Sequence, residues 1–210
     1  TDDVEELESQ GLVHVFKMRK DTFVWHADSA RMAIQKVTDA LKKYEASYPY
    51  RYGMKKAELQ MTYFKKMKPN VFDKVVELLE EKQAVKRIDE FMCTPEYEVR
   101  KDATYDKVSK ILITTFTNAK YDFVRYSEID MKGVSRDIAD DILNILLEEQ
   151  MIVKVTDDMY TLKSNMDSAK EVIQNKLKED SLITIAQVRD IFSTSRKSAK
   201  PILEYMDSIK

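Results

Sequence analysis

The sequence predicts a mainly α-helical protein with small β-hairpins, in which one structural unit is repeated along the chain. Three segments share one pattern, and they begin at Val4, Val76 and Ile145. In each, an amphipathic helix ends with leucine and acidic residues, and a sequence typical of a β-strand follows. Leucines hold the same place in the three segments, and a valine follows each: Leu7, Leu79 and Leu147, then Val13, Val85 and Val153. Repetition at roughly 60–70 residues indicates an array of small domains, since such a unit cannot bury its apolar face alone.

Apolar residues at helical spacing precede the second and third hairpins and continue to the end of the chain. The predicted helices cover 30–46, 55–64 and 69–82, then 103–118, 126–131 and 135–149, and finally 167–178, 185–192 and 195–209. Pro69 suits a helix start, where its missing N–H costs nothing. Each predicted hairpin turns at a polar pair: Lys20-Asp21, Asp89-Glu90 and Asp157-Asp158.

Three helices followed by a hairpin make a winged helix, so we expect tandem winged-helix domains. Residues 1–28 are expected to be the helix end and wing of a first unit, because Thr1 does not read as the start of a whole protein. Residues 29–97 and 98–164 form two complete units, and residues 165–210 form a last unit without its wing. The joints lie near 27–29, 97–102 and 164–167. The second joint is the most polar, and we predict it as the main hinge.

Composition narrows the class of function. The net charge of −2 excludes a globally basic nucleic-acid coat, so any such surface is a local patch. The single cysteine, Cys93, excludes an internal disulfide and indicates a reducing compartment. No stretch of about 18 apolar residues exists. We therefore expect a cytoplasmic monomer that does not enter a membrane.

The sequence offers no catalytic constellation, and we expect a non-catalytic chain without a cofactor. His14 and His26 have no partner at zinc spacing, and Cys93 has no nearby histidine. A phosphate-binding G-x-x-x-x-G-K-[ST] loop is absent from the three-glycine sequence.

The last predicted helix pair, 185–192 and 195–209, forms a helix-turn-helix. Thr184 can cap its first helix, and Ser193 or Ser195 its second. The expected core contacts of the pair are Val188, Ile191, Ala199, Ile202, Leu203 and Met206. Pro201 either kinks the second helix or shows that this helix begins later.

Cations occupy the first two turns of the second helix of this pair, at Arg196, Lys197 and Lys200. Each opposes the helix macrodipole at a cost of about 0.3–1 kcal/mol unless an anion lies nearby. A phosphate would use both the cations and the free backbone N–H groups. The alternative is an ordinary solvated helix start.

Three motifs in this stretch carry a specific resemblance: Val188-Arg189-Asp190, Ser195-Arg196-Lys197-Ser198-Ala199, and the run from Leu203 to Ile209. They resemble the C-terminal part of the bacterial selenocysteine-specific translation elongation factor, SelB, which ends in four tandem winged helices. The earlier residues agree with that family in architecture and repeat order. The family continues into a further wing that also faces RNA, and it carries a GTPase before the repeats.

The resemblance implies a function in protein biosynthesis. In this family the last winged helix grips an mRNA hairpin, the selenocysteine insertion element. The GTP-binding part holds selenocysteinyl-tRNA, so that delivery is restricted to a UGA codon beside the hairpin. By motif match the expected RNA-binding residues are Arg189, Ser195, Arg196, Lys197 and Lys200.

A second basic region lies between residues 31 and 68, with ten basic and three acidic residues; Tyr48, Tyr50, Tyr52 and Tyr63 are interleaved with them. It is either a surface that faces the ribosome or tRNA, or a set of solvated helix faces. Residues 123–163 are acidic, with nine acidic and five basic side chains, and we expect a spacer there.

Two other functions remain open: a winged-helix DNA-binding regulator, and a winged-helix protein-interaction scaffold.

Overall fold

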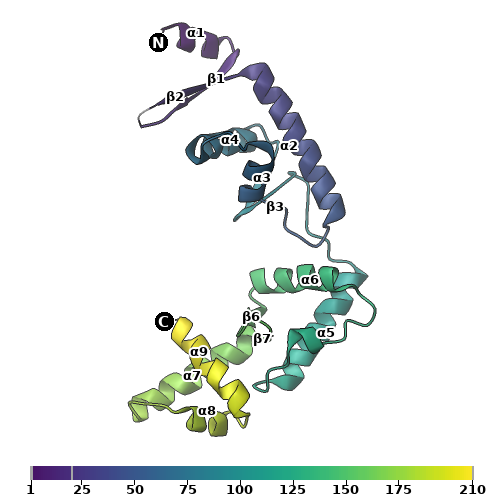
Figure 1. Cartoon of the computed structure of the whole chain (residues 1–210), viewed down its shortest axis with the longest axis vertical. Helices are drawn as coiled ribbons and strands as arrows, with labels where there is room; N and C mark the ends of the chain where they lie inside the picture. Colours follow the sequence, from purple (N-terminus) through teal and green to yellow (C-terminus); the bar gives the residue numbers. More distant parts are fainter. Residues whose placement is uncertain (1, 20, 210) are drawn as a thin grey trace. The chain divides into compact units, whose positions relative to one another are not determined.

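The computed structural model of the protein describes residues 2–19 and 21–209. The chain divides into two compact units, Thr1–Arg100 and Lys101–Lys210. Figure 1 shows mainly helices, with small β-hairpins between groups of them. The predicted fold class, mainly α with small β-hairpins in tandem winged helices, is confirmed.

The described part of the first unit contains four helices and two small antiparallel sheets. Its elements are α1 (Asp2–Ser9), β1 (Val13–Lys17), β2 (Thr22–His26), α2 (Ala27–Ser47), β3 (Met54–Lys55), α3 (Lys56–Tyr63), α4 (Pro69–Glu81), β4 (Lys86–Ile88) and β5 (Phe91–Cys93). Strands β1 and β2 pair antiparallel, with Val15 opposite Val24. The other three strands form an antiparallel sheet in the order β3-β5-β4. The predicted turn at Asp89-Glu90 is observed, whereas Lys20 of the first predicted turn lies outside the described residues.

The described part of the second unit follows an order similar to that from α2 to β5 and then adds three helices. Its elements are α5 (Ala103–Ala119), the 3₁₀ turn η1 (Tyr126–Glu128), α6 (Arg136–Glu148), β6 (Ile152–Lys154), β7 (Tyr160–Leu162), α7 (Lys163–Glu179), α8 (Ile185–Ile191) and α9 (Arg196–Ser208). The helix predicted over 126–131 is only this 3₁₀ turn, followed by extended backbone at Ile129. An isolated bridge between Arg125 and Met159 takes the place that β3 has in the first unit.

Two of the three predicted joints are not linkers. Helix α2 begins at Ala27, directly after β2, and α7 begins at Lys163, directly after β7. The predicted boundaries at 28/29 and 164/165 therefore fall inside continuous helices. The Nδ1 atom of His26 accepts a hydrogen bond from the Asp28 N–H at 3.2 Å, so the last strand residue caps the helix that follows.

The remaining joint, predicted at 97–102, is short and held on both sides. The Tyr97 hydroxyl lies 2.8 Å from the Arg51 carbonyl oxygen, and its burial raises the pKa of Tyr97 to about 12. The Arg100 N–H donates to the Pro49 carbonyl at 2.8 Å. On the other side Asp102 caps α5 by accepting the Thr104 and Tyr105 N–H groups. Because these contacts hold Tyr97, Arg100 and Asp102, the joint is limited to the backbone around residue 101.

Each unit has an apolar core. In the first, side chains from α2, α3, α4 and the sheet pack together: Val37, Leu41, Met54, Leu59, Phe72, Val75, Val76, Leu79, Val85 and Met92. In the second, one core lies among α7, α8 and α9: Met166, Ala169, Ile173, Val188, Ala199 and Ile202. Leu203 and Met206 are half-buried there as predicted, but Ile191 is exposed, so that core prediction was wrong.

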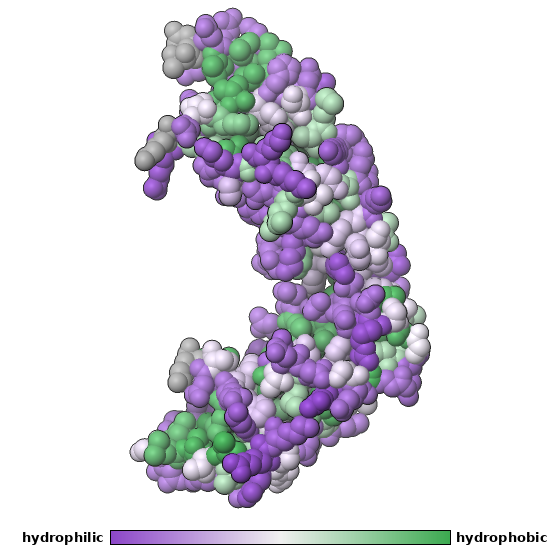
Figure 2. All heavy atoms as spheres, viewed as in Figure 1, coloured by the Kyte–Doolittle hydropathy of each residue, from purple (hydrophilic) through white to green (hydrophobic). Residues whose placement is uncertain are grey.

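Exposed apolar side chains gather at two places on the face shown in Figure 2, over α1 with the β1–β2 hairpin and over the corner between α7 and α8. They include Leu7, Leu12 and Val24 at the first place and Leu177 and Leu182 at the second. The rest of that face is largely polar, which agrees with the 34% content of charged residues.

Candidate nucleic-acid interface

The helix-turn-helix is formed by α8 and α9, as predicted. Thr184 and Gln187 make a reciprocal capping box at the start of α8: the Gln187 N–H donates to the Thr184 hydroxyl, and the Thr184 N–H donates to the Gln187 side chain. Only Thr184 of this pair was predicted as a cap, although the T-x-x-Q spacing is the known signal of this motif. Helix α9 begins at Arg196 and contains Pro201 in its interior, so the helix does not begin later.

The turn between α8 and α9 is fixed by residues of the preceding repeat. The Thr194 hydroxyl lies 2.7 Å from the Tyr121 carbonyl oxygen and 2.5 Å from Oδ1 of Asp122. The same Oδ1 accepts the Ser195 N–H at 3.2 Å. The Phe123 N–H donates to the Ser198 hydroxyl at 3.2 Å. A segment more than 70 residues earlier in the sequence thus holds the start of α9.

These contacts correct the predicted cap of α9. Ser195 occupies the N-cap position, but neither its side chain nor that of Ser193 is the acceptor at this helix start. Asp122 instead accepts the N–H of the N-cap residue Ser195 itself, and Ser193 takes a positive φ of 49° within the turn. A carboxylate near a helix N-terminus interacts favourably with the macrodipole, which offsets part of the cost of the cations there.

The five predicted RNA-binding residues are all exposed and lie on α8, the turn and the first two turns of α9. Arg189 pairs with the neighbouring Asp190 at 2.7 Å, and Lys200 pairs with Glu204 one helical turn later at 3.1 Å. Within residues 2–19 and 21–209, no carboxylate lies at ion-pair distance from Arg196 or Lys197. An anion can therefore approach these two cations and the hydroxyl of Ser195, which directly precedes them in the chain.

Part of the positive charge of the basic region at 31–68 is neutralised by acidic residues from outside the region. Arg31 pairs with Asp28, Lys55 with Glu90 and Lys56 with Asp73, and all three partners lie outside the region. These ion pairs neutralise part of the excess charge. What remains includes the lysines of the α3–α4 corner.

No metal site or membrane-crossing element is found in the described part of the chain. None of its His, Cys, Asp and Glu side chains form a group of three or more that could hold a metal ion. None of its helices combines the length and apolar character needed to cross a membrane.

Helix order, sheet order and wing position define the chain as a tandem winged-helix protein. Two family models, both described as "Elongation factor SelB, winged helix", match residues 38–92 and 175–210. The "Selenocysteine-specific elongation factor" of Desulfomicrobium baculatum is 24% identical over 176 residues, which cover 81% of this chain and 27% of that protein. The chain therefore spans about a quarter of the length of this relative.

A solved structure agrees in fold. The "Crystal structure of bacterial selenocysteine-specific elongation factor EF-Sec" superposes with a TM-score of 0.50 at 14% identity, over 93% of this chain and 30% of that one. The resemblance to the C-terminal winged-helix region of the selenocysteine-specific elongation factor, SelB, which the sequence motifs predict, is confirmed.

Proposed function

We propose that this chain is the RNA-binding region of a selenocysteine-specific elongation factor, and that α8 and α9 grip an mRNA hairpin, the selenocysteine insertion element. The grip tethers a GTPase and its selenocysteinyl-tRNA beside a UGA codon. The role of the chain itself is binding and not catalysis. The two winged-helix matches and the name of the relative from D. baculatum support this proposal.

One observation carries the choice of site: Arg196 and Lys197 stand exposed, without a carboxylate partner in the described structure, at the start of a helix whose turn is fixed by Thr194 and Ser195. Phosphate is the ligand that uses cations and a helix start together. RNA hairpins are recognised by backbone shape and by unstacked loop or bulge bases, and a compact helix-turn-helix can contact such a loop.

The remaining parts of the proposal follow from a role in translation. We propose that the chain works in the cytoplasm, as a monomer, without a cofactor of its own, and that the basic region at 31–68 faces the ribosome. The unpaired lysines of that region support the last point.

The test is a titration of the full chain with a labelled insertion-element hairpin and with a duplex DNA of equal length. We expect preference for the hairpin, and a fall in its affinity of about 10-fold or more in the double variant Arg196→Ala/Lys197→Ala at about 0.1 M salt. The log–log salt slope should fall by roughly 0.7–0.9 for each phosphate that the variant no longer neutralises.

The matched control is Lys110→Ala/Lys178→Ala, which removes the same charge from exposed positions of the same unit. It should bind the hairpin like the unaltered chain. Equal binding of duplex DNA would favour the DNA-regulator alternative. Hairpin affinity that is unchanged in the Arg196→Ala/Lys197→Ala variant would refute the proposed site.

A further inference from the structure

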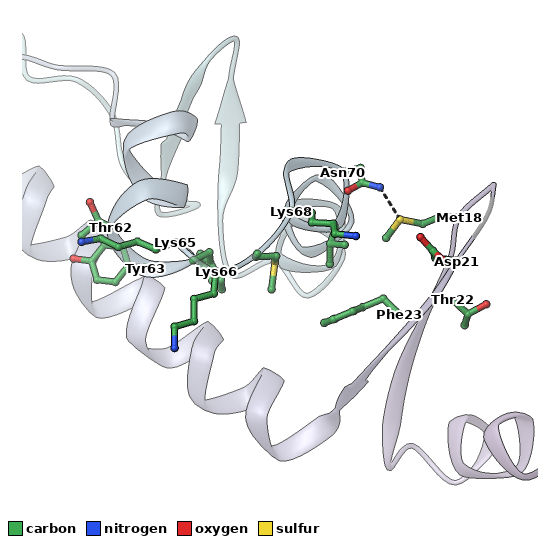
Figure 3. A pocket seen from close by; sticks show the side chains of 13 residues that line it. Met18, Asp21, Thr22, Phe23, Thr62, Tyr63, Lys65, Lys66, Lys68 and Asn70 are labelled. Carbon is green, nitrogen blue, oxygen red and sulfur yellow. Dashed lines mark hydrogen bonds between the residues drawn. The ribbon is translucent and has the colours of Figure 1, made fainter.

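A hollow of about 840 Å³ lies in the first unit, between the β1–β2 hairpin and the corner that joins α3 to α4. Figure 3 shows Asp21, Thr22 and Phe23 on the hairpin side and Tyr63, Lys65 and Lys66 on the corner side. A hydrogen bond joins the two sides at Asn70, whose side-chain amide lies 3.1 Å from the Met18 sulfur.

Part of the lining of this hollow is apolar and aromatic. Phe23, Tyr63, Phe64 and Met67 are half-buried and contribute to its surface. Phe64 is packed on Phe72 of α4, with ring centroids 5.2 Å apart, so this side of the hollow is anchored to the core. Half-buried rings of this kind offer faces on which a flat, apolar group can stack.

Three exposed lysines stand at the rim: Lys65, Lys66 and Lys68. Within the described residues, none of the three has a carboxylate at ion-pair distance. By contrast, Lys55, Lys56 and Lys74 of the same unit all form ion pairs at 2.6–2.9 Å. The hollow therefore combines an aromatic lining with a cluster of cations that no described side chain of its own unit neutralises.

We propose that this hollow binds a single-stranded segment of RNA. A positively charged groove that tracks the backbone, combined with aromatic faces for the bases, is the arrangement that binds single-stranded nucleic acids. The lysines would neutralise phosphates, and Phe23 and Tyr63 would stack on bases. This site is separate from the α8–α9 site, and the inference does not rest on the function proposed for those helices.

The polar groups of the hollow favour RNA over other polyanions. The Asp21 carboxylate, on the hairpin side, can accept a hydrogen bond from a ribose 2′-hydroxyl, the group that distinguishes RNA from DNA. An acidic peptide lacks the flat groups that the aromatic side chains of the hollow accept.

The test uses the full chain with Arg196→Ala/Lys197→Ala in the background, so that binding at α8–α9 does not contribute. The probe is a labelled oligouridylate of about 12 nucleotides, within the roughly 4–16 nucleotides that one such groove spans. We expect the triple variant Lys65→Gln/Lys66→Gln/Lys68→Gln to bind it about 10-fold more weakly. The salt slope should fall by about 2, since each phosphate on a single strand contributes about 0.7.

The matched control is Lys82→Gln/Lys110→Gln/Lys178→Gln, which removes three exposed lysines that lie outside both the hollow and the 31–68 region. It should retain the affinity and slope of the background. An equal loss in this control overturns the proposal, because general charge would then explain the binding. Equal competition by polyglutamate would overturn it in favour of a protein partner, and equal affinity for oligodeoxyuridylate would overturn the RNA assignment.

Photocrosslinking tests the same site without any substitution in the hollow. Oligouridylate that carries 4-thiouridine should crosslink to Phe23 or Tyr63 in the unaltered chain, as mapped by mass spectrometry. Crosslinks confined to residues outside the hollow would refute the site. Reduced hairpin binding in the α8–α9 variant together with retained crosslinks at Phe23 would separate the two sites.

Discussion

At the scale of single residues, Asp122 is the least expected participant in the candidate site. Its Oδ1 accepts hydrogen bonds from the Ser195 N–H and the Thr194 hydroxyl, and so it caps a helix that begins more than 70 residues later. A side-chain acceptor at a helix start typically stabilises the helix by about 1 kcal/mol. The carboxylate also lies near the cations that the sequence places at the helix start.

We predict that Asp122→Ala lowers the free energy of unfolding by about 1 kcal/mol, because the start of α9 loses its acceptor. Urea denaturation followed by circular dichroism measures the change. Asp122→Asn keeps an acceptor oxygen and should lose less. Glu171→Ala, at an exposed position of α7, is the control and should be neutral. If the Ala variant matches this control, Asp122 is not the cap.

The cations of the site were predictable from sequence, but their partners only in part. Lys200 and Glu204 are spaced by four residues on one helix, a spacing that predicts an ion pair. Arg189 and Asp190 are neighbours in the chain. The Asp122 contact depends on the packing of α9 against the preceding repeat, and no local pattern reveals a partner 72 positions away.

At the scale of elements, helix periodicity and turn residues predicted each helical segment. The predicted ends of these helices lie within a few residues of the observed ends, except at 126–131 and at the start of α7. The joints were less predictable. Wing strands β2 and β7 run directly into α2 and α7 without the Gly or Pro that would mark a linker. Because the last strand residue serves as the N-cap in both cases, the sequence shows no break there.

The short strand β3 depends on one glycine. Gly53 has φ +143°, and a Cβ atom there would overlap the Met92 carbonyl oxygen and lie 2.8 Å from its carbon. Met92 is the residue that pairs with Met54 between β3 and β5. Only a residue without a side chain therefore lets these strands approach.

We predict that Gly53→Ala destabilises the first unit by about 2 kcal/mol or more, because the backbone is strained and the β3–β5 pairing must open. Thermal unfolding of the chain measures the loss. Gly11→Ala and Gly133→Ala are the controls: both have positive φ but open space at the Cβ position. They should cost only about 1 kcal/mol. Equal losses at all three glycines would show that the contact with Met92 is unimportant.

At the scale of the whole molecule, the contacts divide the chain into fewer parts than the repeats do. The sequence predicts four winged-helix units, and that division stays a prediction. The compact units are two, with their boundary between Arg100 and Lys101, inside the joint predicted as the main hinge. Within the second unit, the core of α7, α8 and α9 includes half-buried side chains from the preceding repeat: Tyr121, Phe123, Val153 and Val155.

We therefore predict that residues 101–210, produced alone, unfold in one cooperative transition, whereas residues 163–210 do not fold stably. The shorter fragment keeps α7, α8 and α9 but lacks the four apolar partners and the Asp122 cap. A core this small rarely supplies more than about 3–5 kcal/mol, so removing these partners takes away most of its stability. Scanning calorimetry of both fragments is the measurement, and residues 1–100 are the control, with one transition of their own.

A sharp transition for 163–210 would show that the last repeat is independent. Two separate transitions for 101–210 would show that its two repeats are not joined by the Tyr121–Phe123 contacts.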